Sequence, residues 1–339
     1  MKRKILLALL IGVAVAGIVV GARGDMLLAE SDAGPLRPIQ TVPLPGVEGR
    51  IDHLAVDLAG QRLFVAALGN NTVEVIDLKK GQRIHSVAGF KEPQGLAYLP
   101  ETNTVAVANG GDGVVTLLDG ATLKRAKTIA FGEDADNLRY DVTRKRLYVG
   151  YGNGALGAYD TATGARLPDV ALDAHPESFQ LDAAAGRIFV NVASLQKVAV
   201  VDTNRNSVTA TWAVAAGAAN FPMAFDTSHH RLFVLTRKPP HLVVLDTETG
   251  KEVARLPADG DADDLFYDAA RHRLYGCFGA GSVMVYGQSD PDHYAELAKV
   301  PTAAGARTGF FAPELGRLFV AVPHRANPTA EIRVFDTGT

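Results

Sequence analysis

The stretch "RLFVAALGNNTVEVID" (Arg62–Asp77) returns in altered form six more times along the chain. Each copy pairs an apolar run with a second, alternating run across a short polar segment. The later copies are "NTVAVANGGDGVVTLLD" (103–119), "RLYVGYGNGALGAYD" (146–160), "RIFVNVASLQKVAVVD" (187–202), "RLFVLTRKPPHLVVLD" (231–246), "RLYGCFGAGSVMVY" (273–286) and "RLFVAVPHRANPTAEIRVFD" (317–336). Counted from the opening Arg, or from Thr104 in the second copy, they begin 41 to 44 residues apart. A fixed period of this length is typical of a repeat architecture that grows as one body.

Each period holds four short strands. In the first they are "RIDHLAVD", "QRLFVAAL", "NTVEVIDL" and "GQRIHSVAG", and no helical periodicity follows the N-terminal segment. A strand such as "LFVAAL" is apolar on both sides, so it must be covered on both faces, as happens when sheets stack around an axis. Four-stranded sheets at this spacing are the signature of a β-propeller. The sequence therefore predicts an all-β, seven-bladed β-propeller with four antiparallel strands per blade.

The ends of the repeat array predict how the ring closes. The seventh copy leaves sequence for three strands only, whereas "PIQTVPLPG" (38–46) is a spare strand-like segment ahead of the first blade. A ring open between its first and last blades would expose two apolar sheet faces to water. We therefore expect the N-terminal strand to join the last blade, so that residues 38–339 form a single propeller domain.

The N-terminus has the pattern of an export signal. Lys2, Arg3 and Lys4 precede an apolar run over 5–20, and small residues follow up to Ala22. This order predicts a signal peptide over 1–22, and the alternative is a short uncleaved anchor, the only part expected to touch a membrane. The polar segment 23–37 is interpreted as a tether.

Composition restricts the class of protein. The chain is 47% hydrophobic and 21% charged, which is typical of a globular domain with a sizeable core. Its net charge of -3 argues against nucleic acid as a partner. Cys277 is the only cysteine, so no disulfide can form within the chain, and we interpret it as a core residue.

Residues that recur in the copies are interpreted as scaffold. Aspartates that end the third strands can accept hydrogen bonds from turn N–H groups; they are Asp77, Asp160, Asp202 and Asp246. Arginines that follow the turn between first and second strands are expected at turns and edges; they are Arg62, Arg146, Arg187, Arg231, Arg273 and Arg317. Aromatic residues of the second strands are expected to pack between blades; they are Phe64, Tyr148, Phe189, Phe233, Tyr275 and Phe319.

With "LFVAALGNNTVEVID" and its relatives, the chain resembles the YVTN-repeat, YncE-like propeller family of exported bacterial proteins. The resemblance covers residues 39–339, although the sixth copy lacks the closing Asp and the seventh carries the insertion "PHRANPT". It implies the propeller fold and a periplasmic or secreted location. It implies little about chemistry, because the family has no single assigned activity.

Positions that differ among the copies are the candidates for function. In a propeller the loop entering each innermost strand lies on the same face as the loop between the second and third strands, around the channel mouth. The seven entering loops carry different polar groups: "RIDH" (50–53), "EPQG" (92–95), "DADN" (134–137), "HPES" (175–178), "ANFP" (219–222), "DADD" (261–264) and "ARTG" (306–309). From these and the neighbouring loops we predict as ligand-binding residues Arg50, Asp52, His53, Gln94, Asp136, Asn137, His175, Glu177, Asn220, Arg237, Asp263, Asp264, Arg307, His324 and Arg325.

Carboxylates gather on the third, fourth and sixth blades of this predicted mouth. Converging carboxylates repel one another, and a cation relieves the repulsion. We therefore consider Ca²⁺ or another divalent cation, whose ligands would be Asp134, Asp136, Glu177, Asp261 and Asp263. The "DADN" and "DADD" strings lack the rest of a calcium loop, and no other cofactor is indicated.

We identify no catalytic motif: neither "GxSxG" nor "HExxH" occurs in the sequence. The haem-attachment motif "CxxCH" is absent as well. The leading interpretation is an exported, monomeric binding module that holds a small polar ligand or a loop of a partner at the channel mouth. One alternative is a metal-assisted lactone hydrolase or lyase, with His53, His175 or His324 as acid or base. Another is a scaffold that binds other envelope proteins.

Overall fold

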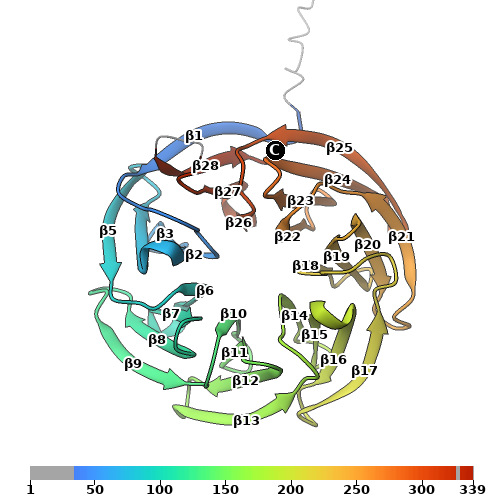
Figure 1. The fold of residues 1–339 in the computed structure, drawn as a ribbon, viewed down its shortest axis with the longest axis horizontal. Coiled ribbons are helices and arrows are strands. Elements are labelled where there is room, and N and C mark those ends of the chain that lie inside the picture. The colour runs from blue at the N-terminus through green and yellow to red at the C-terminus, as the bar shows by residue number, and fades with distance from the viewer. Residues whose placement is uncertain (1–33, 326–328, 339) are drawn as a thin grey trace, which may run out of the picture. The chain divides into compact units, whose positions relative to one another are not determined.

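The computed structural model describes residues 34–325 and 329–338. This part of the chain forms seven four-stranded sheets, or blades, arranged around a central axis (Figure 1). Within every blade the hydrogen-bonded neighbours are antiparallel. The predicted all-β, seven-bladed propeller is therefore confirmed.

The strands of each blade run in sequence order from the axis outward. Blade one contains β2 (Leu54–Asp57), β3 (Arg62–Ala67), β4 (Thr72–Asp77) and β5 (Gln82–Ala88). Blade two contains β6 (Pro93–Leu99), β7 (Thr104–Asn109), β8 (Val114–Asp119) and β9 (Arg125–Ala130). Blade three contains β10 (Ala135–Asp141), β11 (Arg146–Tyr151), β12 (Ala155–Asp160) and β13 (Ala165–Ala171). Blade four contains β14 (Phe179–Asp182), β15 (Arg187–Val192), β16 (Lys197–Asp202) and β17 (Ser207–Ala213).

The remaining blades follow the same order until the ring closes. Blade five contains β18 (Met223–Asp226), β19 (Arg231–Arg237), β20 (Pro240–Asp246) and β21 (Glu252–Pro257). Blade six contains β22 (Ala262–Asp268), β23 (Arg273–Phe278), β24 (Ser282–Asp290) and β25 (His293–Pro301). Blade seven contains β26 (Thr308–Ala312), β27 (Arg317–Val322), β28 (Ala330–Asp336) and β1 (Arg37–Leu44). Single 3₁₀ turns connect some strands: η1 (Leu68–Asn70), η2 (Pro100–Thr102), η3 (Ala193–Leu195) and η4 (Pro313–Leu315).

The expected closure is observed. Strand β1 pairs antiparallel with β28, with Leu44 opposite Ala330 and Arg37 opposite Asp336. In Figure 1 the blue β1 lies along the outer side of the red β28. The first strand in the sequence thus supplies the outer strand of the last blade.

The core consists of seven apolar clusters, one at each junction between neighbouring blades. Phe64, for example, is fully buried and packs with Leu96 and Val105 of blade two. Cys277 is buried in the cluster between blades six and seven. Second and third strands are buried almost throughout, whereas outer strands such as β5 and β17 are mostly exposed. This gradient explains why the second strands are continuous apolar runs.

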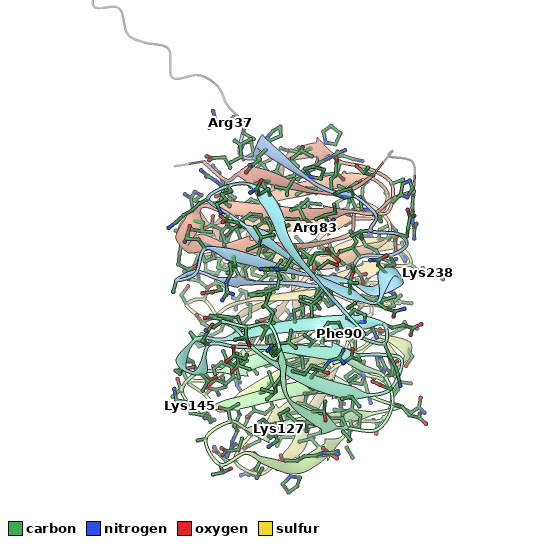
Figure 2. All side chains as sticks on the ribbon, turned by 90° about the vertical axis from the view of Figure 1, so that its left-hand side faces the viewer. Arg37, Arg83, Phe90, Lys127, Lys145 and Lys238 are labelled. Carbon is green, nitrogen blue, oxygen red and sulfur yellow. The ribbon has the colours of Figure 1, made fainter. Side chains whose placement is uncertain are left out.

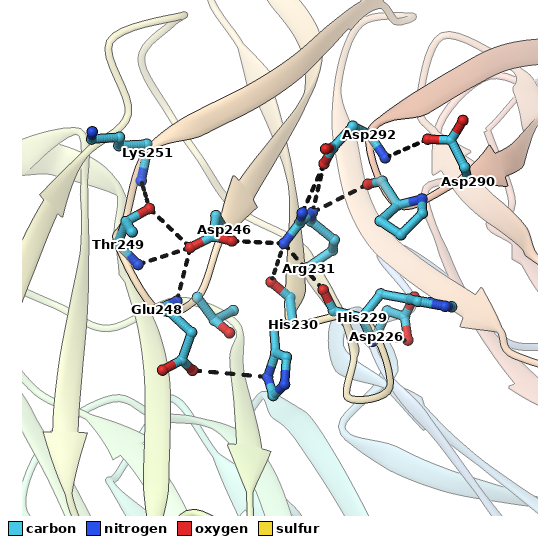
Figure 3. A network of polar contacts seen from close by, with 12 residues as sticks. Asp226, His229, His230, Arg231, Asp246, Glu248, Thr249, Lys251, Asp290 and Asp292 are labelled. Atoms are coloured by element: carbon cyan, nitrogen blue, oxygen red, sulfur yellow. Dashed lines mark hydrogen bonds and ion pairs between the residues drawn. The ribbon is translucent and has the colours of Figure 1, made fainter.

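The recurrent charged residues belong to the scaffold. Asp246 accepts backbone hydrogen bonds from Glu248 and Thr249 at 3.1 and 2.8 Å, as expected for the aspartates that end third strands. Arg231 binds Asp246 at 2.7 Å and reaches Asp292 of blade six at 2.8 Å (Figure 3). The arginine therefore links two blades at their rim.

The loops divide between two faces of the ring. Lys238, in the β19–β20 connection, and Lys145, just before β11, lie at opposite sides in Figure 2. The candidate site lies on the face that carries the β19–β20 connection. His229, His230 and His272 lie in first-to-second-strand turns, on the face of Lys145.

The predicted signal peptide or anchor over 1–22 and most of the predicted tether lie outside the described residues. The propeller itself begins slightly before the expected boundary at Pro38. Strand β1 starts at Arg37, and Leu36 is already buried between blades six and seven. Among the described residues, no helix has the length and apolar character needed to span a bilayer.

Candidate ligand site at the channel mouth

A polar cavity of about 260 Å³ opens at the mouth of the central channel. Every blade contributes to its wall, because each entering loop or neighbouring connection places at least one side chain there. We call it the mouth cavity. Its lining residues are Arg50, Asp52, His53, Gln94, Asp134, Asp136, Asn137, His175, Glu177, Ser178, Phe221, Arg237, Asp263 and Arg307.

The entering loops converge because their backbones turn sharply toward the axis at equivalent positions. Four blades use a non-glycine residue with a left-handed φ at the fourth position before the aligned apolar residue. These residues are Glu92 (52°), Asp134 (43°), Ala219 (58°) and Asp261 (61°). Such backbone conformations are uncommon for side-chain-bearing residues and concentrate at functional sites. Blade one instead uses Gly49, with a φ of 73°, one position earlier.

One side of the mouth cavity is an arginine–carboxylate network between blades five, six and seven. Asp263 binds Arg237 at 2.7 Å and Arg307 at 2.9 Å. Asp261 also binds Arg307 at 2.9 Å. Burial raises the pKa of Asp263, although both guanidinium groups oppose this. The guanidinium group of Arg237 lies 3.8 Å from the ring centroid of Phe221, which covers its other side.

The opposite side is an imidazole–carboxylate cluster between blades three and four. One ligating atom from each of Asp136, His175 and Glu177 lies within 4.8 Å of the others. His175 places Nε2 3.8 Å from Asp136 Oδ2, while its Nδ1 lies 2.6 Å from the carbonyl oxygen of Gly152. A carbonyl oxygen only accepts hydrogen bonds, so Nδ1 is the protonated donor of this pair.

This imidazole–carboxylate cluster has strongly shifted proton affinities. Burial, and then the neighbouring Asp136, raise the pKa of Glu177 to about 8. Asp136 raises the pKa of His175 to about 9 against the effect of burial. Groups shifted in this way, in a cavity, mark candidate functional sites.

The base of the mouth cavity is closed by His53. Its Nδ1 lies 3.3 Å from Asp264 and its Nε2 3.8 Å from Asp52. Burial works to lower the pKa of His53, but the two carboxylates outweigh it and raise the pKa to about 10. His53 is therefore protonated near neutral pH and is unsuited to act as a general base there. Below it lies a second cavity of about 420 Å³, lined mainly by the innermost strands.

The structure brings most of the predicted ligand-binding residues together. Those that line the mouth cavity are Arg50, Asp52, His53, Gln94, Asp136, Asn137, His175, Glu177, Arg237, Asp263 and Arg307. Asp264 lies next to His53 and accepts a hydrogen bond from the backbone N–H of Gly309 at 2.8 Å. That these residues bind a ligand stays a prediction.

Four predicted ligand residues do not line the mouth cavity: Asp264, which lines the second cavity, and Asn220, His324 and Arg325. Asn220 is fully buried and donates to Asn191 of β15 at 2.9 Å, so it joins the entering loop of blade five to a strand of blade four. His324 pairs with Glu48 at 2.6 Å, and Arg325 is exposed. Blade seven therefore contributes through Arg307 of its entering loop.

The predicted metal ligands are divided between the two sides. Asp136 and Glu177 lie together, but with His175 in place of Asp261 and Asp263. Those two aspartates pair with Arg237 and Arg307 instead. Asp134 lines the mouth cavity and accepts a hydrogen bond from Gln94 at 3.1 Å.

Sequence reasoning passed over two lining residues, Ser178 and Phe221. Both stand in the quoted entering loops "HPES" and "ANFP". Charge and amide content alone do not predict Phe221. Phe221 stands in the entering loop of blade five, the blade that also carries Arg237, and an aromatic side chain beside a cation was the available signal.

Comparisons in sequence lead to one group of proteins. No family model matches the chain. It is 26% identical over 261 residues to the uncharacterized protein YncE of Salmonella typhimurium, a region that covers 72% of this chain and 73% of YncE. With YncE of Escherichia coli K12 the identity is 30% over 168 residues, or 44% of this chain and 47% of that protein. Together with the seven blades, these matches confirm the resemblance to YncE-like propellers.

Comparisons in structure support the fold alone. A chain of hydrazine synthase from Kuenenia stuttgartiensis superposes with a TM-score of 0.71 and 17% identity, covering 86% of this chain and 98% of its own. A chain of a mitotic checkpoint complex superposes with a TM-score of 0.76 and 13% identity, covering 96% and 99%. Identities this low carry no information about ligand or activity.

Proposed function

We propose that this YncE-like propeller is an interaction module whose mouth cavity holds a small polar ligand. The likeness to YncE supports a propeller interaction module in general. The finer proposal is that the ligand binds where the entering loops converge. A cavity of about 260 Å³ is close to the lower end of the usual range for ligand pockets, so the ligand is small.

The observation that carries this proposal is a pair of buried polar atoms that belong to residues lining the cavity. Arg50 Nε and Asn137 Oδ1 are buried and have no hydrogen-bond partner among the described residues. Buried polar groups in folded proteins are nearly always paired, because leaving one unpaired costs about 1–3 kcal/mol. One of the two is a donor and the other an acceptor, so the expected ligand offers both kinds of group.

Charge favours the same class of ligand. The wall carries both carboxylates and guanidinium groups, and His53 is protonated near neutral pH because its pKa is raised to about 10. A wall with both signs of charge favours a zwitterion or a hydroxylated acid over a purely cationic or apolar molecule. Because residues 1–22 have the order of an export signal, we propose that binding takes place in the periplasm or outside the cell.

Thermal unfolding of the full chain tests the proposal. L-glutamate, L-arginine and citrate, each at ~10 mM in the presence of EDTA, serve as probes, because a ligand that binds only the folded state raises Tm. At least one probe should raise the Tm of the wild-type protein measurably. The same probe should have no effect on the Arg50→Gln/Arg307→Gln variant.

Arg255→Gln provides the matched control, because Arg255 lies on an outer strand and pairs with Glu252 at 2.8 Å, away from the cavity. It should respond to the probe as the wild type does. If none of the three probes changes Tm, or if the shift persists in the double variant, the proposed ligand site is wrong.

A further inference from the structure

We propose that Asp136, His175 and Glu177 hold one divalent transition-metal ion, of the class of Zn²⁺ or Mn²⁺, in the mouth cavity. The inference deepens the proposed function, on which it rests for the location of the cavity. The ion would occupy the side between blades three and four, opposite the arginine–carboxylate network.

The spacing of the three ligating groups suits a single ion. The three ligating atoms lie within 4.8 Å of one another, and the two atoms of Asp136 and His175 are 3.8 Å apart. Metal–ligand bonds of about 2.0–2.2 Å place tetrahedral ligands roughly 3.4 Å apart, slightly closer than Asp136 and His175 and well inside the 4.8 Å limit for the set. Small side-chain rotations would therefore bring the three groups onto an ion. Three protein ligands next to an open cavity leave coordination positions for water or another molecule.

The hydrogen bond from Nδ1 of His175 orients its ring for an ion. Its Nδ1 donates a proton to the carbonyl oxygen of Gly152 at 2.6 Å. Histidines that bind metals usually donate their second N–H to a carbonyl or carboxylate, which orients the ring and leaves the other nitrogen for the ion. Here that other nitrogen is Nε2, the atom that faces Asp136. Because the pKa of His175 is raised to about 9, Nε2 carries a proton near neutral pH in the metal-free protein, and a bound ion would displace it. A surface histidine without such an anchor would lack this orientation.

The residue after Asp136, whose unpaired oxygen also supports the proposed ligand site, favours the same place for the ion. Asn137 is 3% exposed, lines the same cavity, and has an amide oxygen without a hydrogen-bond partner in the described part of the chain. A buried amide oxygen that lacks a partner, in a residue lining the same cavity, would be satisfied if the ion or a water bound to it filled this part of the cavity.

The donor set selects the class of metal. Imidazole together with carboxylates suits Zn²⁺, Mn²⁺ and related ions, whereas Ca²⁺ prefers oxygen ligands alone. The purely carboxylate set expected from the sequence would have suited Ca²⁺. In the structure Asp261 and Asp263 pair with Arg237 and Arg307, which leaves Asp136 and Glu177 beside His175.

Titration calorimetry of the chelator-stripped full chain with Zn²⁺ alone tests the inference. The wild-type protein should bind one ion per chain saturably, and an excess of Ca²⁺ should not displace it. His175→Gln and Glu177→Gln should each weaken binding by tenfold or more. Tm of each variant without metal shows that it is folded, so a loss of binding is not a loss of structure.

His293→Gln is the matched control, because His293 forms an exposed pair with Asp290 at 2.8 Å on an outer strand. It should bind Zn²⁺ as the wild type does. Absence of saturable binding, unchanged binding in His175→Gln and Glu177→Gln, or equal loss in His293→Gln would overturn the inference. The calorimetric test contains Zn²⁺ and no organic probe, whereas the thermal test contains organic probes and EDTA. Each experiment therefore tests one proposal without the other, so either proposal can fail alone.

Discussion

At the scale of single residues, this propeller uses two sets of aspartates with different surroundings. Those that end third strands, such as Asp246, cap exposed turns. Those that end innermost strands are buried, and they are Asp57, Asp141, Asp182, Asp226 and Asp268. The second set pairs with a basic residue of the following turn or strand; Arg62, for example, binds Asp57 at 2.6 Å. Buried carboxylates with such partners contribute to stability only while they are ionised.

Asp226 allows this dependence on ionisation to be tested. Burial works to raise its pKa, but hydrogen bonds from Ser228, His229 and Gln288 outweigh this and lower the pKa to about 2. Because the pKa of Asp226 is lower in the folded than in the unfolded state, its ionised carboxylate stabilises the fold above about pH 4. This contribution is lost as pH falls toward 2. Asp226→Asn should therefore lower the free energy of unfolding at pH 7 by roughly 2 kcal/mol.

Urea unfolding at pH 7, 4 and 2.5 measures the effect. The difference between wild type and Asp226→Asn should shrink as pH falls, because the wild-type carboxylate becomes protonated. Asp202→Asn changes a partly exposed residue at the end of β16 and should lose much less stability at any pH. A difference for Asp226→Asn that is constant from pH 7 to 2.5 would show that its ionisation does not matter.

At the scale of elements, strand β1 is the one on which closure of the ring depends. Its residues alternate toward its end: Val42 and Leu44 are buried in the cluster between blades seven and one, while Ile39 is 43% exposed. The strand therefore joins two blades through one face and meets solvent through the other.

We predict that Leu44→Ala lowers the free energy of unfolding by about 2–5 kcal/mol, because it leaves a cavity at a fully buried position. Ile39→Ala, on the same strand, should change it by less than about 0.5 kcal/mol. Chemical denaturation of the full chain provides both values. Equal effects of the two substitutions would mean that β1 does not seal the ring through its buried face.

At the scale of the whole molecule, the junctions between blades form a continuous circle of apolar clusters. Each blade contributes to two of them, so no blade keeps its core if a neighbour unfolds. Trp212, the only tryptophan, packs on Phe189 in blade four with ring centroids 5.4 Å apart. Its fluorescence therefore reports on a part of the ring remote from β1.

We predict that Leu44→Ala shifts the unfolding transition seen by Trp212 fluorescence by the same amount as the transition seen by far-UV circular dichroism. Coincidence of the two is expected if the ring unfolds as one unit. A shift in circular dichroism without a shift in Trp212 fluorescence would mean that blades unfold separately.

Much of the candidate site could be predicted from the repeats. Equivalent positions that form the scaffold keep their residue type in each copy. The polar residues that vary are therefore visible in the sequence, and three of them, Arg50, Asp136 and Arg307, line the mouth cavity. The pairing among them could not be predicted. Glu177 and Asp263 have the same charge, yet one lies beside His175 and the other between two arginines.

The sequence by itself determined the number of blades, the four strands of each and the closing partner of β28, because these follow from a period and from alternation along the chain. Only the tertiary structure decided which polar side chains pair across the channel, since loops from different blades meet there at angles that no local pattern encodes. It brings Asp136 and Glu177 together with His175, sets Asp261 and Asp263 against arginines, and leaves Asp264, Asn220, His324 and Arg325 outside the lining of the mouth cavity.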